Sequence, residues 1–373
     1  MKTERHGHSD LSVWKYPALL MGILLVISLI FAVSDLDRKI LTYVYSQNDG
    51  WYLSGLRPVV WLYKYGTIPG LLLSLGSLIG YCLCIARNRD KEWTRIFLVI
   101  LLTSIVGGGL IVNAALKNYW GRPRPNQTED FGGRWQYHPV YEPGIPGKGK
   151  SFPCGHCTMG YLFITFLYLR RKTPVIAGIG GVFGVVYGTA IGIGRVLQGA
   201  HFPTDVIWSF GIMLLVSMAA YRVVNTEKFA KLISLSGYSP RMRKLLWTAM
   251  GVLSIAICLA FATQRPYYDT YYQSFPLSPN IEELVVETNV EFDRTEVLYG
   301  NTHRGEMQLY AKGFGLPNVY HAVREKSFSL DGTYVISNRI ETRGLFSELS
   351  HGISLYLPES LKGTVRVTFI TIP

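Results

Sequence analysis

Seven long, uncharged apolar runs constrain the fold of this chain more than any other feature of its sequence. They cover residues 17–33, 67–86, 96–116, 158–169, 174–193, 206–221 and 245–262. A helix of roughly 20 apolar residues spans the hydrocarbon core of a bilayer, and most of these runs approach that length. The run at 158–169 becomes long enough if its helix begins a few residues earlier. The sequence therefore predicts a multi-pass membrane protein.

Basic residues mark alternate sides of these spans. Lys and Arg gather in four segments, at 1–16, 87–95, 170–173 and 222–244. Positively charged loops favour the cytoplasm, so we expect these segments on the inner side of the cytoplasmic (inner) membrane. The outer, periplasmic side then receives the loops at 34–66, 117–157 and 194–205 and everything after 262. These clusters account for part of the net charge of +12, so no nucleic-acid partner is expected.

The pattern changes at the C-terminal end, where apolar and polar residues alternate, as in VRVTFI at 365–370. A period of two predicts strands. We therefore expect an all-α integral membrane helical bundle, with a six-helix core plus a seventh span, and a C-terminal all-β extramembrane domain. The expected parts are a tail at 1–16, a membrane core at 17–224, a link with the seventh helix at 225–265, and the β-rich domain at 266–373. Nothing in that last domain identifies a protein partner.

Three cations on the expected outer loops form a candidate anion site. Lys117, Arg124 and Arg195 offer a point charge and two planar forks of donors, which suit phosphate oxygens. Gly155 lets a backbone N–H approach a ligand without a side chain in the way. A helix beginning near Cys154 would add free N–H groups and its dipole.

Two histidines accompany these cations, His156 and His201, each at an expected helix start. Asp205 follows His201 by four residues, a spacing compatible with a hydrogen bond that fixes the imidazole tautomer. One oriented imidazole beside an anion site can attack phosphorus, and a second can protonate the leaving oxygen.

These segments resemble the motifs of a known superfamily. KNYWGRPRP at 117–125, PCGH at 153–156 and GRVLQGAHFPTD at 194–205 match KxxxxxxRP, PSGH and SRxxxxxHxxxD. In this order and spacing the three motifs are typical of the type 2 phosphatidic acid phosphatases, a superfamily that includes the vanadium-dependent haloperoxidases. The resemblance covers roughly residues 50–222.

The resemblance implies a role for each residue. His201 is expected to be the nucleophile that forms a phosphohistidine, Asp205 its orienting partner, and His156 the general acid. The expected phosphate-binding residues are Lys117, Arg122, Arg124, Cys154, Gly155 and Arg195. With the cations balancing the phosphate charge, no metal or other cofactor is expected.

Two positions depart from the superfamily pattern. The Ser of PSGH is Cys154, whose thiol is a weaker hydrogen-bond donor, and the Ser before Arg195 is Gly194. Both changes weaken the expected clamp but leave the nucleophile and the acid in place.

The tetrapeptide CGHC at 154–157 has a competing interpretation as a thiol–disulfide redox centre. That interpretation requires a preceding strand in a βαβ frame, whereas a Gly- and Pro-rich loop precedes this motif and an apolar helix is expected after it. It also leaves the other motif residues unexplained. A smaller hypothesis remains, in which a Cys154–Cys157 disulfide forms on the oxidising side of the membrane and distorts the phosphate site.

The sequence thus predicts a metal-independent membrane phosphatase. The expected substrate is a lipid phosphate or diphosphate reached from the outer leaflet: lipid A, undecaprenyl diphosphate, phosphatidylglycerophosphate or phosphatidic acid. Three alternatives remain: a lipid phosphotransferase that uses the same phosphohistidine, a haloperoxidase, and a non-catalytic lipid-binding protein. The polar, aromatic loop at 126–150 and the extra domain slightly favour an envelope glycolipid. His138 in that loop is expected to be a solvated histidine rather than a substrate contact.

Overall fold

The computed structural model describes most of the chain in two compact units, Met1–Cys258 and Leu259–Pro373. The described residues are 11–371 without 48, 87–90, 134, 147–148, 227–228, 230–238, 240, 243, 246–247, 250, 253–254, 257–264, 278–280, 291, 293, 316–319, 331 and 344–347.

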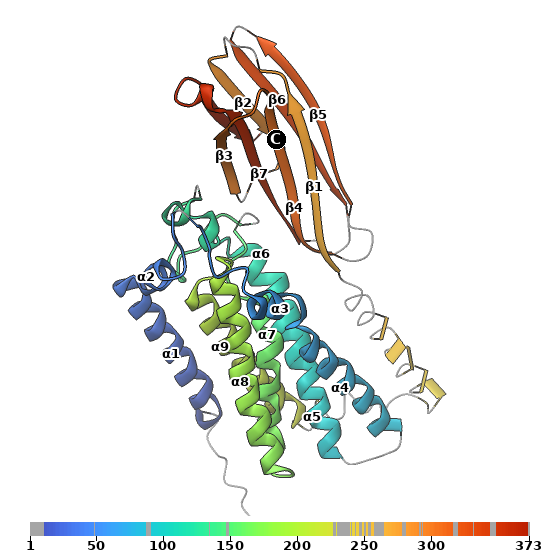
Figure 1. Cartoon of the computed structure of the whole chain (residues 1–373). Helices are drawn as coiled ribbons and strands as arrows, with labels where there is room; N and C mark the ends of the chain where they lie inside the picture. Colours follow the sequence, from blue (N-terminus) through green and yellow to red (C-terminus); the bar gives the residue numbers. More distant parts are fainter. Residues whose placement is uncertain are drawn as a thin grey trace, which may run out of the picture. The chain divides into compact units, whose positions relative to one another are not determined.

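The first unit is helical (Figure 1). Its α-helices are α1 (Leu11–Ser34), α2 (Leu36–Thr42), α3 (Arg57–Tyr65), α4 (Ile68–Ala86), α5 (Lys91–Leu102), α6 (Lys117–Tyr119), α7 (Gly155–Tyr161), α8 (Pro174–Leu197) and α9 (Pro203–Val224). A π-helical segment, η1 (Thr103–Leu116), joins α5 to α6, and a 3₁₀ segment, η4 (Leu162–Leu169), continues α7. Two short 3₁₀ turns, η2 (Pro125–Gln127) and η3 (Glu129–Phe131), lie in the loop after α6.

Within the described residues, five helical stretches are long and apolar enough to cross a membrane: Lys15–Ser34, Arg57–Ile85, Glu92–Tyr119, Pro174–Leu197 and Pro203–Val224. They correspond to five of the predicted spans. Large apolar side chains on their outer faces are exposed, such as Val33 (80%) and Val182 (66%), as contact with lipid requires. The prediction of a multi-pass membrane protein is confirmed.

The two remaining predicted spans, 158–169 and 245–262, are not among these five stretches. The span at 158–169 corresponds to α7 and η4, which together run from Gly155 to Leu169, so the helix does begin within the CGHC segment. The span at 245–262 falls largely outside the described residues. The expected count of six core helices plus one therefore stays a prediction.

Glycines let α8 approach α7 and η4 closely. A Cβ at Gly160 would lie 2.5 Å from the Cα of Gly188, and one at Gly184 would lie 2.7 Å from the backbone N of Ile164. Inside a bilayer the hydrophobic effect does not drive helices together, so close van der Waals packing at small residues stabilises such crossings. This packing fixes the beginning of α7 relative to α8, and these two helices carry two of the three motifs.

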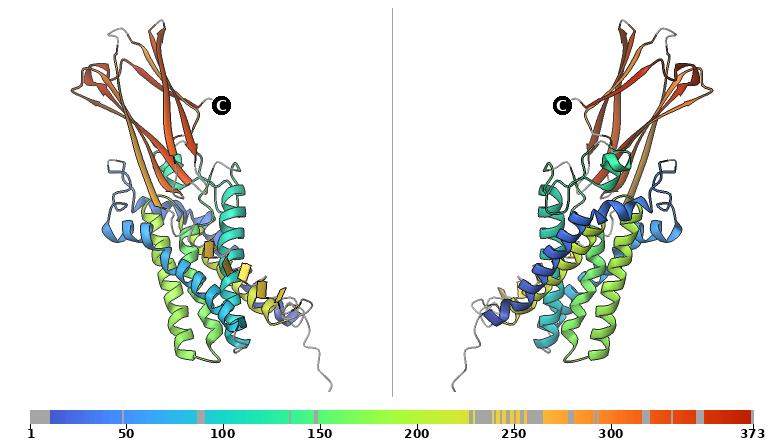
Figure 2. Two further views of the ribbon diagram at one scale, coloured as in Figure 1. Left: turned by 90° about the vertical axis from the view of Figure 1, so that its right-hand side faces the viewer. Right: turned by 90° about the vertical axis from the view of Figure 1, so that its left-hand side faces the viewer.

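The second unit is all-β, as the alternating pattern predicted. One sheet has the order β1–β4–β7–β3 and the other β5–β6–β2–β8. The strands are β1 (Arg265–Phe275), β2 (Glu283–Thr288), β3 (Arg294–Gly300), β4 (Gly305–Gly315), β5 (Tyr320–Leu330), β6 (Thr333–Arg343), β7 (Glu348–Pro358) and β8 (Arg366–Thr371). The sheets form two layers (Figure 2) around a shared core that includes Val286, Ile336 and Leu355.

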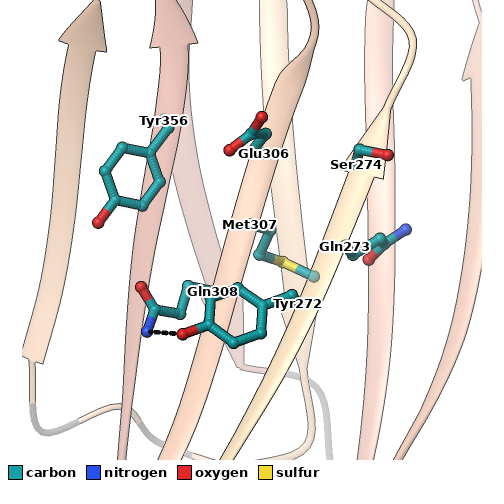
Figure 3. A pocket seen from close by; sticks show the side chains of 7 residues that line it. All are labelled: Tyr272, Gln273, Ser274, Glu306, Met307, Gln308 and Tyr356. Atoms are coloured by element: carbon teal, nitrogen blue, oxygen red, sulfur yellow. Dashed lines mark hydrogen bonds between the residues drawn. The ribbon is translucent and has the colours of Figure 1, made fainter.

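A hollow opens on the β1–β4–β7 sheet of this unit (Figure 3). It is lined by Tyr272, Gln273, Ser274, Glu306, Met307, Gln308 and Tyr356. These side chains offer no cation and no imidazole to a phosphate. None of the motif residues lines it, so the chemistry predicted from the motifs belongs to the helical unit.

Candidate active site

Backbone hydrogen bonds join the three motif segments at one end of the helical bundle. Ser151 N donates to Arg122 O (3.0 Å), which ties the second segment to the first. Cys154 N donates to Asp205 O (3.4 Å), and Asn126 N donates to Gly199 O (3.0 Å), so the third segment contacts both others. The fold therefore brings together segments that lie up to 73 positions apart in the sequence.

Several of the expected site residues lie at or beside a helix end. Lys117 begins α6, Gly155 begins α7, Arg195 lies in the last turn of α8, and Asp205 lies in the first turn of α9. His156 is the second residue of α7. Lys117 and Arg195 are each only 8% exposed. Two largely buried cations at one end of the bundle are suited to hold an anion such as phosphate.

Asn113 links Gly155 to the helix that carries Lys117. A Cβ at Gly155 would lie 2.3 Å from Asn113 Oδ1, so only glycine fits there without displacing the amide. Asn113 precedes Lys117 by four residues and therefore shares its helix face. Asn113 belongs to none of the three motifs, although a polar side chain within an apolar run is a recognisable signal.

His201 is buried, at 1% exposure, and its ring orientation is defined. Its Nδ1 lies 2.5 Å from the carbonyl oxygen of Ser151. A carbonyl can only accept a hydrogen bond, so Nδ1 carries the proton and Nε2 keeps its lone pair. The tautomer required of a nucleophilic histidine is thus selected by a backbone carbonyl.

Asp205 reaches His201 mainly through Ser151, rather than by the direct hydrogen bond that the sequence suggested. Its Oδ2 lies 3.7 Å from His201 Nδ1, longer than a hydrogen bond. The same oxygen accepts from Ser151 Oγ (2.6 Å) and from the backbone N–H of Phe202 (2.8 Å). Ser151 therefore donates to the carboxylate and accepts from the imidazole. No motif signal pointed to this serine.

The neighbours of His201 also set its pKa. Burial lowers the pKa of His201, but the Cys154 sulfur and the Asp205 carboxylate outweigh burial and raise the pKa above its ordinary value. The neutral, nucleophilic form of the imidazole therefore predominates only above that raised pKa.

Arg122 does not occupy the position expected of a fourth phosphate ligand. Its side chain has no exposed surface, and it donates to Asp37 Oδ2 (2.8 Å) and Asp205 Oδ1 (2.6 Å). Its Nε donates to the carbonyl of His138 (2.9 Å). Spacing along the chain indicated a cation near the site but not that two carboxylates surround it.

Comparisons with known proteins identify the family of this chain. The model of the PAP2 superfamily matches residues 97–229. A lipid A 4'-phosphatase of Francisella tularensis subsp. novicida is 31% identical over 201 residues, covering 52% of this chain and 88% of that protein. The chain belongs to the PAP2 superfamily. This membership confirms the prediction of a membrane-embedded phosphatase.

Two further relatives of this PAP2 protein and one solved structure also match. A lipid A 4'-phosphatase of Rhizobium leguminosarum is 31% identical over 36% of this chain and 57% of that protein. Phosphatidylglycerophosphatase B of Bacillus subtilis is 27% identical over 39% of this chain and 64% of that protein. A solved PAP2-type phosphatidylglycerolphosphate phosphatase from Bacillus subtilis has 20% identity and a TM-score of 0.34, covering 55% of this chain and 93% of that one.

The two cysteines of the CGHC segment are free thiols in this PAP2 protein. Both are fully buried, and Cys157 Sγ donates to the carbonyl oxygen of Cys154 (3.1 Å). Cys154 precedes α7 at the position that the superfamily fills with serine. The hypothetical Cys154–Cys157 disulfide is not formed in this structure.

Tyr63 of α3 contacts two of the expected site residues. The His156 ring stacks on it with centroids 5.6 Å apart and an interplanar angle of 25°. The Arg195 guanidinium lies 4.5 Å from the centre of the same ring, a cation–π distance. Arg195 is further held by Gln198, whose Oε1 lies 2.5 Å from Nη1. Tyr63 lies outside the motifs, and no spacing rule pointed to it.

Replacing Tyr63 by leucine is expected to lower kcat/KM about 10-fold, because the side chains of His156 and Arg195 both lose the ring that holds them in place. Tyr63→Phe keeps the ring and should stay within about 3-fold of the wild type. Steady-state phosphate release measures both variants. Equal losses in Tyr63→Leu and Tyr63→Phe would assign the effect to the hydroxyl and contradict the stacking role.

Proposed function

We propose that this chain is a membrane lipid phosphatase that hydrolyses a phosphate monoester of lipid A through a phosphohistidine on His201. The observation that carries the proposal is the buried His201 imidazole. Its Nδ1 proton is held by the Ser151 carbonyl (2.5 Å), which leaves Nε2 as the reactive nitrogen. An imidazole in this tautomer beside buried cations is suited to attack phosphorus.

We propose a reaction in two steps. Nε2 of His201 forms a bond to phosphorus as the bond to the lipid oxygen breaks, and His156 gives that oxygen a proton. Water then attacks the phosphohistidine, His156 takes the proton from the water, and inorganic phosphate leaves while Nε2 is restored. Microscopic reversibility makes one residue acid and base in turn. Each step conserves charge and protons.

The cations supply the electrostatic part of catalysis. We propose that Lys117, Arg124 and Arg195 hold the non-bridging phosphoryl oxygens, with the Gly155 amide beside them. Fixed donors aimed at developing charge contribute most where water is excluded. Among the described residues no three His, Cys, Asp or Glu side chains gather as a metal site. Metal independence stays a prediction.

A lipid substrate fits both the membrane helices and the relatives. Several similar proteins are named as lipid A 4'-phosphatases or lipid A 1-phosphatases, and one as phosphatidylglycerophosphatase B. We therefore place lipid A first among the four lipid classes predicted from the sequence. The basic clusters on alternate loops support a cytoplasmic N-terminus, with the site at the outer face of the inner membrane.

A substrate screen tests this proposal. The purified full chain in detergent micelles is given lipid A, undecaprenyl diphosphate, phosphatidylglycerophosphate and phosphatidic acid in turn. We expect inorganic phosphate to be released fastest from lipid A, with at least about a tenfold lead in kcat/KM. Mass spectrometry of the product assigns the position that lost phosphate. Faster release from another class would replace lipid A as the substrate, and transfer to a lipid without free phosphate would indicate a phosphotransferase.

A further inference from the structure

Asp37, Arg122 and Asp205 form a buried charge cluster that the phosphatase motifs alone do not contain. Arg122 Nη2 donates to Asp37 Oδ2 (2.8 Å), and Arg122 Nη1 donates to Asp205 Oδ1 (2.6 Å). The three side chains are at most 2% exposed. Asp37 lies in α2, well before the region 97–229 that matches the superfamily model.

Asp37 also caps the helix that carries Asp205. Helix α9 begins at Pro203, and the next N–H, that of Thr204, has no acceptor within the helix. Asp37 Oδ1 accepts this N–H at 3.0 Å, and Asp37 Oδ2 accepts the Thr204 hydroxyl at 2.5 Å. A carboxylate at a helix N-terminus is favoured by hydrogen bonding and by the helix dipole. One side chain from α2 thus fixes the start of α9.

The guanidinium of Arg122 is held on every side. Besides the two carboxylates, Nη1 donates to Thr204 Oγ1 (2.9 Å), and Nε donates to the carbonyl of His138. Its flat face lies 4.2 Å from the centre of the Phe202 ring. A buried charge with this many partners has one low-energy position, since moving away would leave charges unpaired in a medium of low polarity.

The position of Asp205 is therefore set from both sides. Arg122 holds Oδ1, while Ser151 and the Phe202 amide hold Oδ2 next to His201. We propose that Asp37 is a positioning residue of the phosphatase site, acting through Arg122 and the start of α9 to hold Asp205 against the nucleophile His201. This inference rests on the proposed function, because its readout is the activity of that nucleophile.

The charges of this cluster give the proposal a distinctive readout. Among the described residues, the titratable groups with the largest effect on His201 are Cys154 and Asp205, and the proposed site adds Lys117, Arg124, Arg195 and His156 on its phosphate side. Behind Asp205 lie Arg122, Asp37 and the Tyr137 hydroxyl, which donates to Asp37 at 3.4 Å. The nucleophile reacts as the neutral imidazole, so activity should rise with pH through the pKa of His201. Removing a nearby negative charge lowers that pKa, and removing a nearby positive charge raises it.

Two single variants should therefore move the acid limb of the pH profile in opposite directions. We expect Asp37→Asn to move the limb of kcat/KM to lower pH, and Arg122→Gln to move it to higher pH, each by about half a unit or more. Both should lower kcat by about 10- to 100-fold with KM within about 3-fold, since the phosphate-binding cations are untouched. The double variant restores the local net charge, so its limb should return towards that of the wild type while kcat stays low.

The controls separate positioning from folding. Asp130→Asn removes a half-exposed carboxylate that pairs with Arg38 at 3.4 Å, and it should leave kcat and the pH limb unchanged. If the buried variants do not purify as folded protein, Thr204→Val keeps every charge and removes one hydroxyl from the cluster, and it should lower kcat at least about 3-fold.

Three results would overturn the inference: wild-type kcat in Asp37→Asn, acid limbs that move in the same direction in the two single variants, or wild-type kcat in Thr204→Val. Failure of the proposed function is distinct from these, because wild-type protein would then release no phosphate from any of the four lipids.

Discussion

Replacing His201 by alanine is expected to abolish phosphate release, with a loss in kcat of about 10⁴-fold or more. The variant lacks Nε2, the proposed nucleophile, and no other imidazole among the described residues has its Nδ1 proton held by Ser151. Release of inorganic phosphate from the preferred lipid measures the loss. Wild-type protein quenched in base during turnover with ³²P-labelled lipid should carry label, and His201→Ala should carry none.

His138 provides the matched control for this variant. Its side chain is 26% exposed and pairs with Glu142 at 3.3 Å, while its contact with Arg122 uses only the backbone carbonyl. His138→Ala should therefore keep kcat within about 3-fold of the wild type. A His201→Ala protein that retains more than about a hundredth of the wild-type rate would contradict the phosphohistidine mechanism.

The large elements of the fold were predictable because each follows from local chemistry. Long apolar runs gave the membrane helices, and a period of two gave the strands of the C-terminal unit. The run at 158–169 is too short to span a bilayer unless its helix begins earlier, and the helix does begin at Gly155. The parallel pairing of β2 with both β6 and β8 was not predictable, since alternation identifies a strand but not its neighbour.

The site was predictable only as far as its motifs extend. The chemistry of the outer loops indicated His201, His156 and the cations, and the resemblance added their expected roles. Ser151, Asn113 and Tyr63 belong to no motif, and their contribution depends on packing between segments. A spacing rule cannot indicate which of several arginines in one loop is buried.

Asp37 shows most clearly why some residues of the site could not be predicted from the sequence. It is one acidic residue in a seven-residue helix of mixed composition, 85 positions from Arg122. Its partners are identified only when the chain brings α2 to the start of α9. A buried carboxylate is stable only where it has such partners, so the role of Asp37 can be identified only from the tertiary fold.

The second large effect is expected for His156, the proposed general acid. His156→Ala should lower kcat on a lipid phosphate about 10²- to 10⁴-fold, because the leaving oxygen of a sugar or alcohol is a strong base and must be protonated as the bond breaks. An aryl phosphate such as p-nitrophenyl phosphate has a leaving group that departs as an anion. With that substrate the same variant should lose less than about 10-fold. Steady-state phosphate release on both substrates gives the comparison.

The ratio of the two losses separates acid catalysis from a structural role of His156. The ring of His156 stacks on Tyr63, so its removal also loosens the support of Arg195. Loosened phosphate binding would slow both substrates equally, whereas loss of the proton donor slows only the poor leaving group. Tyr63→Leu provides the reference for the first effect, because it disturbs the same stack and retains the imidazole. Equal losses of His156→Ala on the lipid and the aryl phosphate would therefore contradict the assignment of His156 as the acid.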